Sequence, residues 1–171
     1  MYTARHIPAL ACCAALFAVA GCQRDDEAQM RARLAPMFAL GDTLAFSARA
    51  RCAMGAFRLV HDRVGSGLPV EDSVQAWVRA LGQRGRGALD LPGLSPDAAM
   101  VAVANTDRPL GMAMRGRSIE ARDCMDDRIK TEFTRLLRAD GIVIGFDAAE
   151  GAVMLMDRRN AVLLVVVGER P

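Results

Sequence analysis

Three short apolar runs lie close together in the last third of the sequence and predict a β-sheet. They cover residues 142–147, 152–157 and 161–167, and the segments between them contain glycine, asparagine and charged residues. Short gaps with turn-forming residues are typical of antiparallel hairpins, so the sequence predicts a three-stranded meander. The last run is apolar on both faces, which indicates a central strand or one that is covered on both sides.

A second alternating stretch, residues 43–60, also predicts extended structure. Leu44, Phe46 and Cys52 lie at even positions, and polar residues such as Arg49 lie between them. This period of two is typical of a strand with one buried face. The alternation changes phase at residues 53–55, which indicates either a β-bulge in one bent strand or a turn between two strands. The pattern leaves both alternatives open.

Three short helices are predicted where apolar residues recur at helical spacing, over residues 28–40, 74–81 and 95–104. Pro36 interrupts the first, so we expect a kink or a new turn there. The third has the clearest beginning, since Ser95 is a good N-cap and Pro96 suits the first helical position.

The longest helix is predicted over residues 109–138. Its apolar residues repeat with helical period and comprise Ala121, Met125, Ile129, Phe133 and Leu136. Asp126 and Lys130 are expected to pair across one turn. Cys124 lies beside the apolar stripe, so it can face a sheet that carries Cys52.

These elements predict an α+β fold. An antiparallel sheet would combine residues 43–60 with the three-stranded meander near the C-terminus, and the long helix would pack on one face. The length of 171 residues is that of a single domain. The composition, with 52% apolar residues, excludes a disordered chain. The formal net charge of +2 is too small to indicate binding to nucleic acid.

The first residues predict a secretory signal peptide. Arg5 lies in a short positive segment, and an apolar run covers residues 7–19. This run is shorter than the roughly 20 residues that a transmembrane helix needs, but it matches the apolar part of a signal peptide.

The run ends in Val19, Ala20, Gly21 and Cys22. These residues resemble the lipobox of bacterial lipoproteins, in which an apolar residue and two small residues precede a cysteine. The resemblance implies cleavage before Cys22, a diacylglyceryl thioether on its sulfur, and acylation of the new amino group. Two or more acyl chains anchor a protein stably, whereas one chain binds only marginally.

The resemblance also implies a location and a division of the chain. An aspartate after the lipobox cysteine favours the inner membrane in the enterobacterial pattern, so Gln23 favours the outer membrane, with the protein facing the periplasm. We expect a signal peptide over residues 1–21, the lipidated Cys22 with a short charged tether over 22–27, and one α+β domain over 28–171. The lipid bilayer would then be a partner through the acyl chains.

Cysteine usage predicts one disulfide. Cleavage removes Cys12 and Cys13, and lipidation uses Cys22, which leaves Cys52 and Cys124. An even number of cysteines in an oxidising compartment favours a bridge. Two separate buried thiols, or a redox or metal pair, are the alternatives, although no Cys-x-x-Cys spacing supports the last of these.

The residues that catalysis needs are scarce. After the predicted cleavage His61 is the only histidine, so nearly any catalytic triad or zinc site would have to use it. Its charged neighbours indicate a surface position. Lys130 is the only lysine, and it lies near acidic residues that favour a solvated ion pair. The sequence therefore predicts no catalytic residue, metal or cofactor.

Two groups of residues could have a chemical role, but a structural role explains each of them better. The acidic residues of the longest predicted helix are Glu120, Asp123, Asp126 and Asp127. They could serve a glycosidase or bind calcium, but on one helix face they are typical of a solvated surface. The pairs Met112 with Met114 and Met154 with Met156 could bind copper, but such spacing is also typical of core packing.

A glycine-rich segment from Gly82 to Gly87 contains Arg84 and Arg86 and predicts a mobile basic loop. Arginine side chains bind phosphate and carboxylate groups well, so these two are candidate ligand contacts. The strand–loop–helix setting of a P-loop is absent.

The sequence thus favours a non-enzymatic envelope lipoprotein that binds a protein or another envelope component beside the membrane. The alternative is an enzyme acting on a glycan or lipid, or a small-ligand binder, that uses the acidic helix or the loop at residues 82–87.

Overall fold

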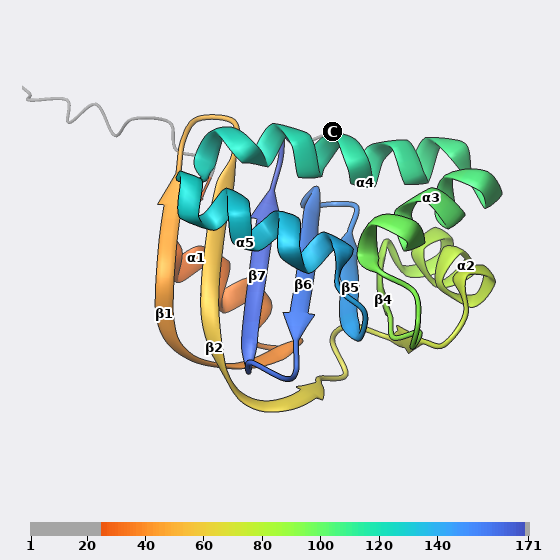
Figure 1. Cartoon of the computed structure of the whole chain (residues 1–171), viewed down its shortest axis with the longest axis horizontal. Helices are drawn as coiled ribbons and strands as arrows, with labels where there is room; N and C mark the ends of the chain where they lie inside the picture. The colour runs from red at the N-terminus through yellow and green to blue at the C-terminus, as the bar shows by residue number, and fades with distance from the viewer. Residues whose placement is uncertain (1–24, 170–171) are drawn as a thin grey trace, which may run out of the picture.

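The computed structural model describes residues 25–169 and has an α+β fold around one seven-stranded sheet (Figure 1). The predicted fold class is confirmed. The strands are β1 (Phe38–Ala48), β2 (Ala53–Val64), β3 (Val70–Glu71), β4 (Arg86–Leu89), β5 (Ile142–Asp147), β6 (Ala152–Asp157) and β7 (Val162–Val167). The helices are α1 (Glu27–Leu34), α2 (Val74–Arg84), α3 (Pro96–Thr106), α4 (Arg108–Glu120) and α5 (Asp127–Arg138), with a 3-10 turn η1 (Ala121–Cys124) between the last two.

The strands lie in the order β1-β2-β7-β6-β5-β4-β3, and neighbours are antiparallel except for β3 and β4. The predicted meander is confirmed as β5, β6 and β7. Strand β7 lies between β2 and β6, where Leu164 pairs with Ala56 on one side and Leu155 on the other. The apolar last run is therefore a central strand.

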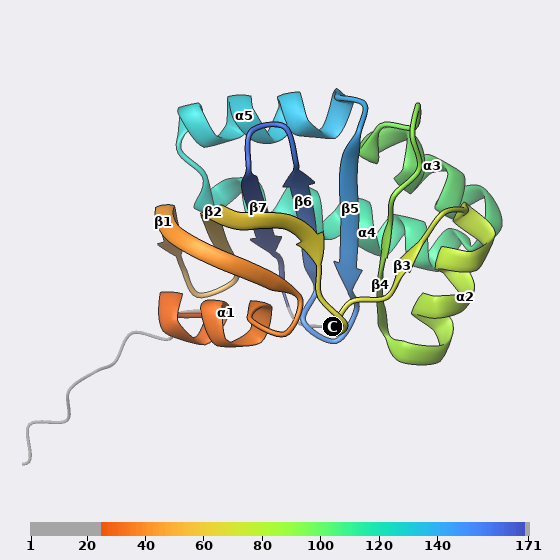
Figure 2. The same ribbon diagram turned by 90° about the horizontal axis from the view of Figure 1, so that it is seen from below.

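Both faces of the sheet are covered, which explains why the meander is apolar throughout. Ile144, Leu155 and Leu164 point toward the core that contains side chains of α2, α3, α4 and α5. Met154 and Val165 point to the opposite core, which α1 covers. Figure 2 shows α5 and α1 on opposite sides of the sheet.

The segment at residues 43–60 belongs to a hairpin of β1 and β2. In its turn the backbone N–H of Arg49 donates to the carbonyl oxygen of Cys52, at 2.9 Å. The change of phase at residues 53–55 thus marks the start of a second strand, and the bent-strand alternative is wrong. Strand β1 forms one edge of the sheet and has three register shifts against β2.

The single helix predicted over residues 109–138 is wrong in its extent. Helix α4 ends at Glu120, η1 follows, and Met125 is extended, with φ −106° and ψ 137°. Asp126 then caps a new helix, because its side chain accepts a hydrogen bond from the N–H of Ile129 at 2.8 Å. The predicted pairing of Asp126 with Lys130 is therefore replaced: Lys130 lies 3.6 Å from Asp127.

Asp25, three residues before the predicted start of the domain, makes contacts within the fold. The Asp25 side chain is buried against Arg33, and Asp26 caps α1 through a capping box with Gln29. The last three residues of the predicted tether are thus part of the fold. Cys22 and the rest of the lipobox lie outside the described residues.

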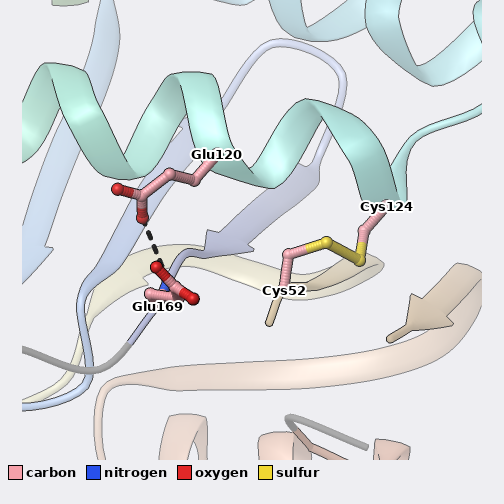
Figure 3. The surroundings of a disulfide bond; sticks show 4 residues. All are labelled: Cys52, Glu120, Cys124 and Glu169. Carbon is pink, nitrogen blue, oxygen red and sulfur yellow. Dashed lines mark hydrogen bonds between the residues drawn. A yellow bond between two sulfur atoms is a disulfide. The ribbon is translucent and has the colours of Figure 1, made fainter. Parts of the chain in front are cut away.

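The predicted disulfide is confirmed. Cys52 and Cys124 are bonded, with their Cα atoms 5.9 Å apart, within the usual range for such bonds. Cys52 lies directly before β2 and Cys124 ends η1, so the bridge ties the first hairpin to the helical layer (Figure 3). Both cysteines are buried, which favours a structural role over a redox one.

Candidate functional site

A pocket of about 420 Å³ opens between α1 and the sheet face that α1 covers. This volume falls within the range of about 300–1,000 Å³ typical of small-molecule sites. Its lining comes from α1, the α2–β4 junction, the β5–β6 hairpin and β7, and comprises Met30, Ala32, Arg33, Leu34, Pro36, Met37, Arg84, Gly85, Arg86, Asp147, Ala149, Glu150, Ala152, Met154, Val165 and Val167.

The floor of the pocket is apolar and rich in methionine. Met30 of α1 faces Met154 and Val165 of the sheet, within one core. Gly55 allows α1 to come this close, because a Cβ atom there would lie 2.6 Å from the Met30 sulfur. The side chains of Met30, Met154 and Val165 are at most 1% exposed, so they pack against one another as part of the core beneath the pocket.

On one side of the pocket rim, acidic side chains are paired with Arg33. Arg33 binds the buried carboxylate of Asp25 and lies 3.8 Å from Glu150. Burial alone would lower the pKa of the Arg33 guanidinium, but the hydrogen bond and charge of Asp25 outweigh burial and raise it.

The other side of the rim contains Arg84 and Arg86, so both candidate ligand contacts line the pocket. A guanidinium nitrogen of Arg86 lies 4.0 Å from Asp147, at the outer limit of an ion pair. The other carboxylate oxygen of Asp147 accepts hydrogen bonds from the N–H groups of Ala149 and Glu150. Among the residues that the structure describes, Arg84 has no acidic partner.

The predicted mobile loop at residues 82–87 is wrong. Helix α2 continues to Arg84, and β4 begins at Arg86. Between them Gly85 adopts a left-handed conformation, with φ 69°, and its N–H donates to the Leu81 carbonyl. A glycine at this position is a common helix C-cap. The glycine-rich spacing therefore reflects a tight helix-to-strand junction, which holds the two arginines in place.

No serine, cysteine, histidine or lysine lines this pocket. Those side chains serve as nucleophiles in covalent catalysis, but aspartate and glutamate can also act as nucleophiles, and the carboxylates of Asp147 and Glu150 do line the pocket.

Comparisons with protein-family models, curated proteins and solved structures give no match. The assignment of function therefore depends on the residues themselves. Within residues 25–169, no helix is long and apolar enough to cross a membrane.

Of the acidic residues in the predicted long helix, Glu120 and Asp123 line one pocket together with Glu169, whereas Asp126 and Asp127 lie outside that pocket. Glu120 accepts a hydrogen bond from Arg117. It accepts another from the Glu169 N–H, which Figure 3 shows. Burial alone would raise the pKa of the Glu120 carboxyl, but these hydrogen bonds lower it. Asp123 and Asp127 are exposed. In the described part of the chain no group of three acidic, histidine or cysteine side chains could hold a metal.

The other candidate residues have structural positions. His61 is exposed on β2, and its Nδ1 accepts a hydrogen bond from the Arg63 N–H. Met154 and Met156 are buried on the same sheet face, as core packing requires. Met112 is exposed, whereas Met114 is buried in the other core.

Sequence reasoning found Arg84 and Arg86 but missed the rest of the pocket. Arg33, Asp147 and Glu150 are far apart in the chain, and only the packing of α1 beside the β5–β6 hairpin brings them together. The one local signal was the run of charged residues at 24–27, which marks the start of α1.

Proposed function

We propose that this protein is a lipid-anchored, non-enzymatic binding module of the bacterial cell envelope. It is attached to the membrane through Cys22, at the outer membrane with the domain facing the periplasm, and it binds its ligand in the pocket beneath α1. The observation that carries the proposal is the position of that pocket: its rim residue Arg33 binds Asp25, which follows Cys22 by three residues in the sequence.

The length of chain between anchor and pocket supports this arrangement. Three residue steps separate Cys22 from Asp25, and three steps of fully extended chain span at most about 11 Å. Acylation at Cys22 would therefore hold the rim of the pocket close to the membrane surface. That the domain also binds a protein of the cell envelope stays a prediction from the sequence.

Labelling with a clickable palmitate analogue tests the anchor. We expect label on the wild-type protein and none on Cys22→Ala, because the substitution removes the sulfur that carries the diacylglyceryl group. Membrane fractions are compared by in-gel fluorescence, and Cys52→Ala serves as the control because its sulfur lies in the buried bridge. Equal label on wild type and Cys22→Ala contradicts the proposal.

A further inference from the structure

We infer that one exposed side of α4 docks on the anionic lipid surface to which the chain is anchored. Four residues form this side, which we call the α4 stripe: Arg108, Met112, Arg115 and Ile119. The inference rests on the proposed function, because acylation at Cys22 is what brings a lipid surface next to the domain.

Basic and apolar side chains alternate along the α4 stripe. Its residues are four, three and four positions apart, and residues at such spacing lie on one side of a helix. All four are exposed, and Met112 and Ile119 are 55% and 67% exposed. This combination suits the boundary between lipid head groups and acyl chains, where apolar side chains insert and basic ones meet the head groups.

The charge of the α4 stripe is positive and unpaired. Neither Arg108 nor Arg115 forms an ion pair among the described residues. Residues 108–119 contain no aspartate or glutamate. The side chain of Asp107, directly before them, caps the helix by accepting a hydrogen bond from the Leu110 N–H at 3.1 Å. Charge complementarity therefore favours an anionic surface as the partner.

The carboxylates closest to the α4 stripe do not pair with its arginines. Asp97 of α3 lines a small hollow with Arg115, but the two form no ion pair. Glu120 is paired with Arg117. Asp123 lines the hollow beside the β1–β2 turn. The stripe thus keeps its positive charge for a partner outside the domain.

Helix α4 lies at the end of the sheet where the chain enters from the anchor. Arg33 binds Asp25 and lies 3.8 Å from Glu150 in the β5–β6 turn. In the same turn, a Cβ atom on Gly151 would lie 3.2 Å from the Arg117 side chain of α4. Figure 1 shows α4 across this end of the sheet. Since three residue steps separate Asp25 from the lipidated cysteine, an anchored chain presents α4 to the lipid surface.

Photocrosslinking of the full chain in lipid vesicles tests the inference. A photoreactive amino acid replaces Ile119 in one preparation and Val60 in another, and the vesicles contain phosphatidylcholine with or without phosphatidylglycerol. Val60 is the matched control, because it is 70% exposed and lies on β2.

We expect lipid adducts at position 119 to exceed those at position 60 by at least about tenfold in vesicles that contain phosphatidylglycerol. Adducts at position 119 should fall severalfold without phosphatidylglycerol, because the arginines then lose their anionic partner. Mass spectrometry of the adducts measures both.

Arginine variants test the charge of the α4 stripe. Arg108→Ala with Arg115→Ala should lower lipid adducts at position 119 about tenfold in vesicles with phosphatidylglycerol, because both attractions to the head groups are lost. Arg58→Ala with Arg63→Ala removes two exposed arginines of β2 and should leave the adducts unchanged.

Met112→Ser tests the apolar part and should lower the adducts severalfold, because less apolar surface enters the lipid. Leu44→Ser is its control, since Leu44 is 47% exposed on β1, and it should have no effect. Circular dichroism of each variant confirms that the fold is kept.

The inference is overturned by equal lipid adducts at positions 119 and 60, by equal adducts with and without phosphatidylglycerol, or by equal effects of the two arginine pairs. Adducts between two protein chains at position 119 also overturn it, since a second copy would then cover the α4 stripe.

The intact mass of the same preparation reports acylation at Cys22 and separates the two proposals. Acylated chains that give no lipid adducts at position 119 refute docking through the α4 stripe and leave the anchor standing. Unacylated chains that still give these adducts refute the anchor and leave the α4 stripe standing.

Discussion

Asp157, at the end of β6, is 2% exposed, but its carboxylate has several partners. One oxygen accepts hydrogen bonds from the Arg135 guanidinium at 2.8 Å and the Asn160 side-chain amide at 2.7 Å. The other accepts from the Asn160 backbone N–H. Burial alone would raise the pKa of Asp157, but these hydrogen bonds outweigh burial and lower it. The residue thus joins α5 to the β6–β7 turn.

Asp157→Ala should lower the free energy of unfolding by about 1–3 kcal/mol at neutral pH, because the hydrogen bonds that Arg135 and Asn160 donate to a charged carboxylate are lost. The pKa is lower in the folded state than in the unfolded state, so this stabilisation is complete above the ordinary pKa of about 4 and is lost as the pH falls through the lower folded value. Urea unfolding from neutral to acidic pH measures the difference between wild type and variant.

Glu132→Ala is the matched control, since Glu132 binds the same arginine from a more exposed position. It should cost less than about 1 kcal/mol, as exposed ion pairs do. Equal losses for Asp157→Ala and Glu132→Ala would contradict this account.

At the scale of elements, the contact between α1 and the sheet depends on Gly55. A Cβ atom at this position would lie 2.6 Å from both the Met30 sulfur and the Phe57 ring. Helix α1 covers its sheet face through Met30 and Leu34, which are both buried. The absence of a side chain at Gly55 of β2 therefore allows α1 to pack this closely against the sheet.

Gly55→Ala should destabilise the protein by about 1–3 kcal/mol, the usual cost of forcing extra volume into a packed core. Gly82→Ala offers a control of opposite sign, because Gly82 lies within α2 and its Cβ would meet no atom within 4 Å. Alanine is favoured over glycine inside a helix, so Gly82→Ala should stabilise by about 0.4–1 kcal/mol. Thermal unfolding followed by circular dichroism measures both, and a neutral Gly55→Ala would contradict this account of the close contact.

Elements with strong local signals were predictable from the sequence. Ser95 and Pro96 begin α3 as expected, and the three runs of the meander match β5, β6 and β7 to within one residue. Short strands without a distinctive pattern could not be predicted from the sequence. Strand β4 has four residues, two of them Gly87 and Ala88, and it is a strand because it pairs with β5.

The break between α4 and α5 shows why periodicity alone misleads. The apolar stripe passes through Met125, which is buried but extended. Asp126 has the side chain of a good N-cap, and in the folded protein this local preference prevails over continuation of the helix. The pocket was beyond prediction for a different reason, since its rim depends on contacts between distant residues such as Arg33 and Glu150.

For the whole molecule, the bridge between Cys52 and Cys124 closes a loop of 72 positions that includes β2, β3, β4 and helices α2, α3 and α4. Such a bridge restricts the unfolded chain strongly. It also joins the sheet to the helical layer at one end of β2.

Cys52→Ala with Cys124→Ala should lower the free energy of unfolding by about 2–5 kcal/mol. Urea unfolding with and without reductant measures this, and the double variant, unlike the wild type, should not respond to the reductant. Unfolding midpoints of the wild type that are the same in both conditions would contradict a structural bridge.

Strand β7 is the last of the described strands in sequence order but lies inside the sheet, between β2 and β6. Until β7 is present, β2 and β6 each have an open row of hydrogen-bonding groups, and β2 has no strand other than β1 with which it pairs. Pairing between segments so distant along the chain is slow. In a chain exported N-terminus first, as the predicted signal peptide implies, the sheet could close only after its final strand had crossed the membrane. The sheet would then be completed only after synthesis and export. Until export was complete, the chain would remain in a form that can cross the membrane.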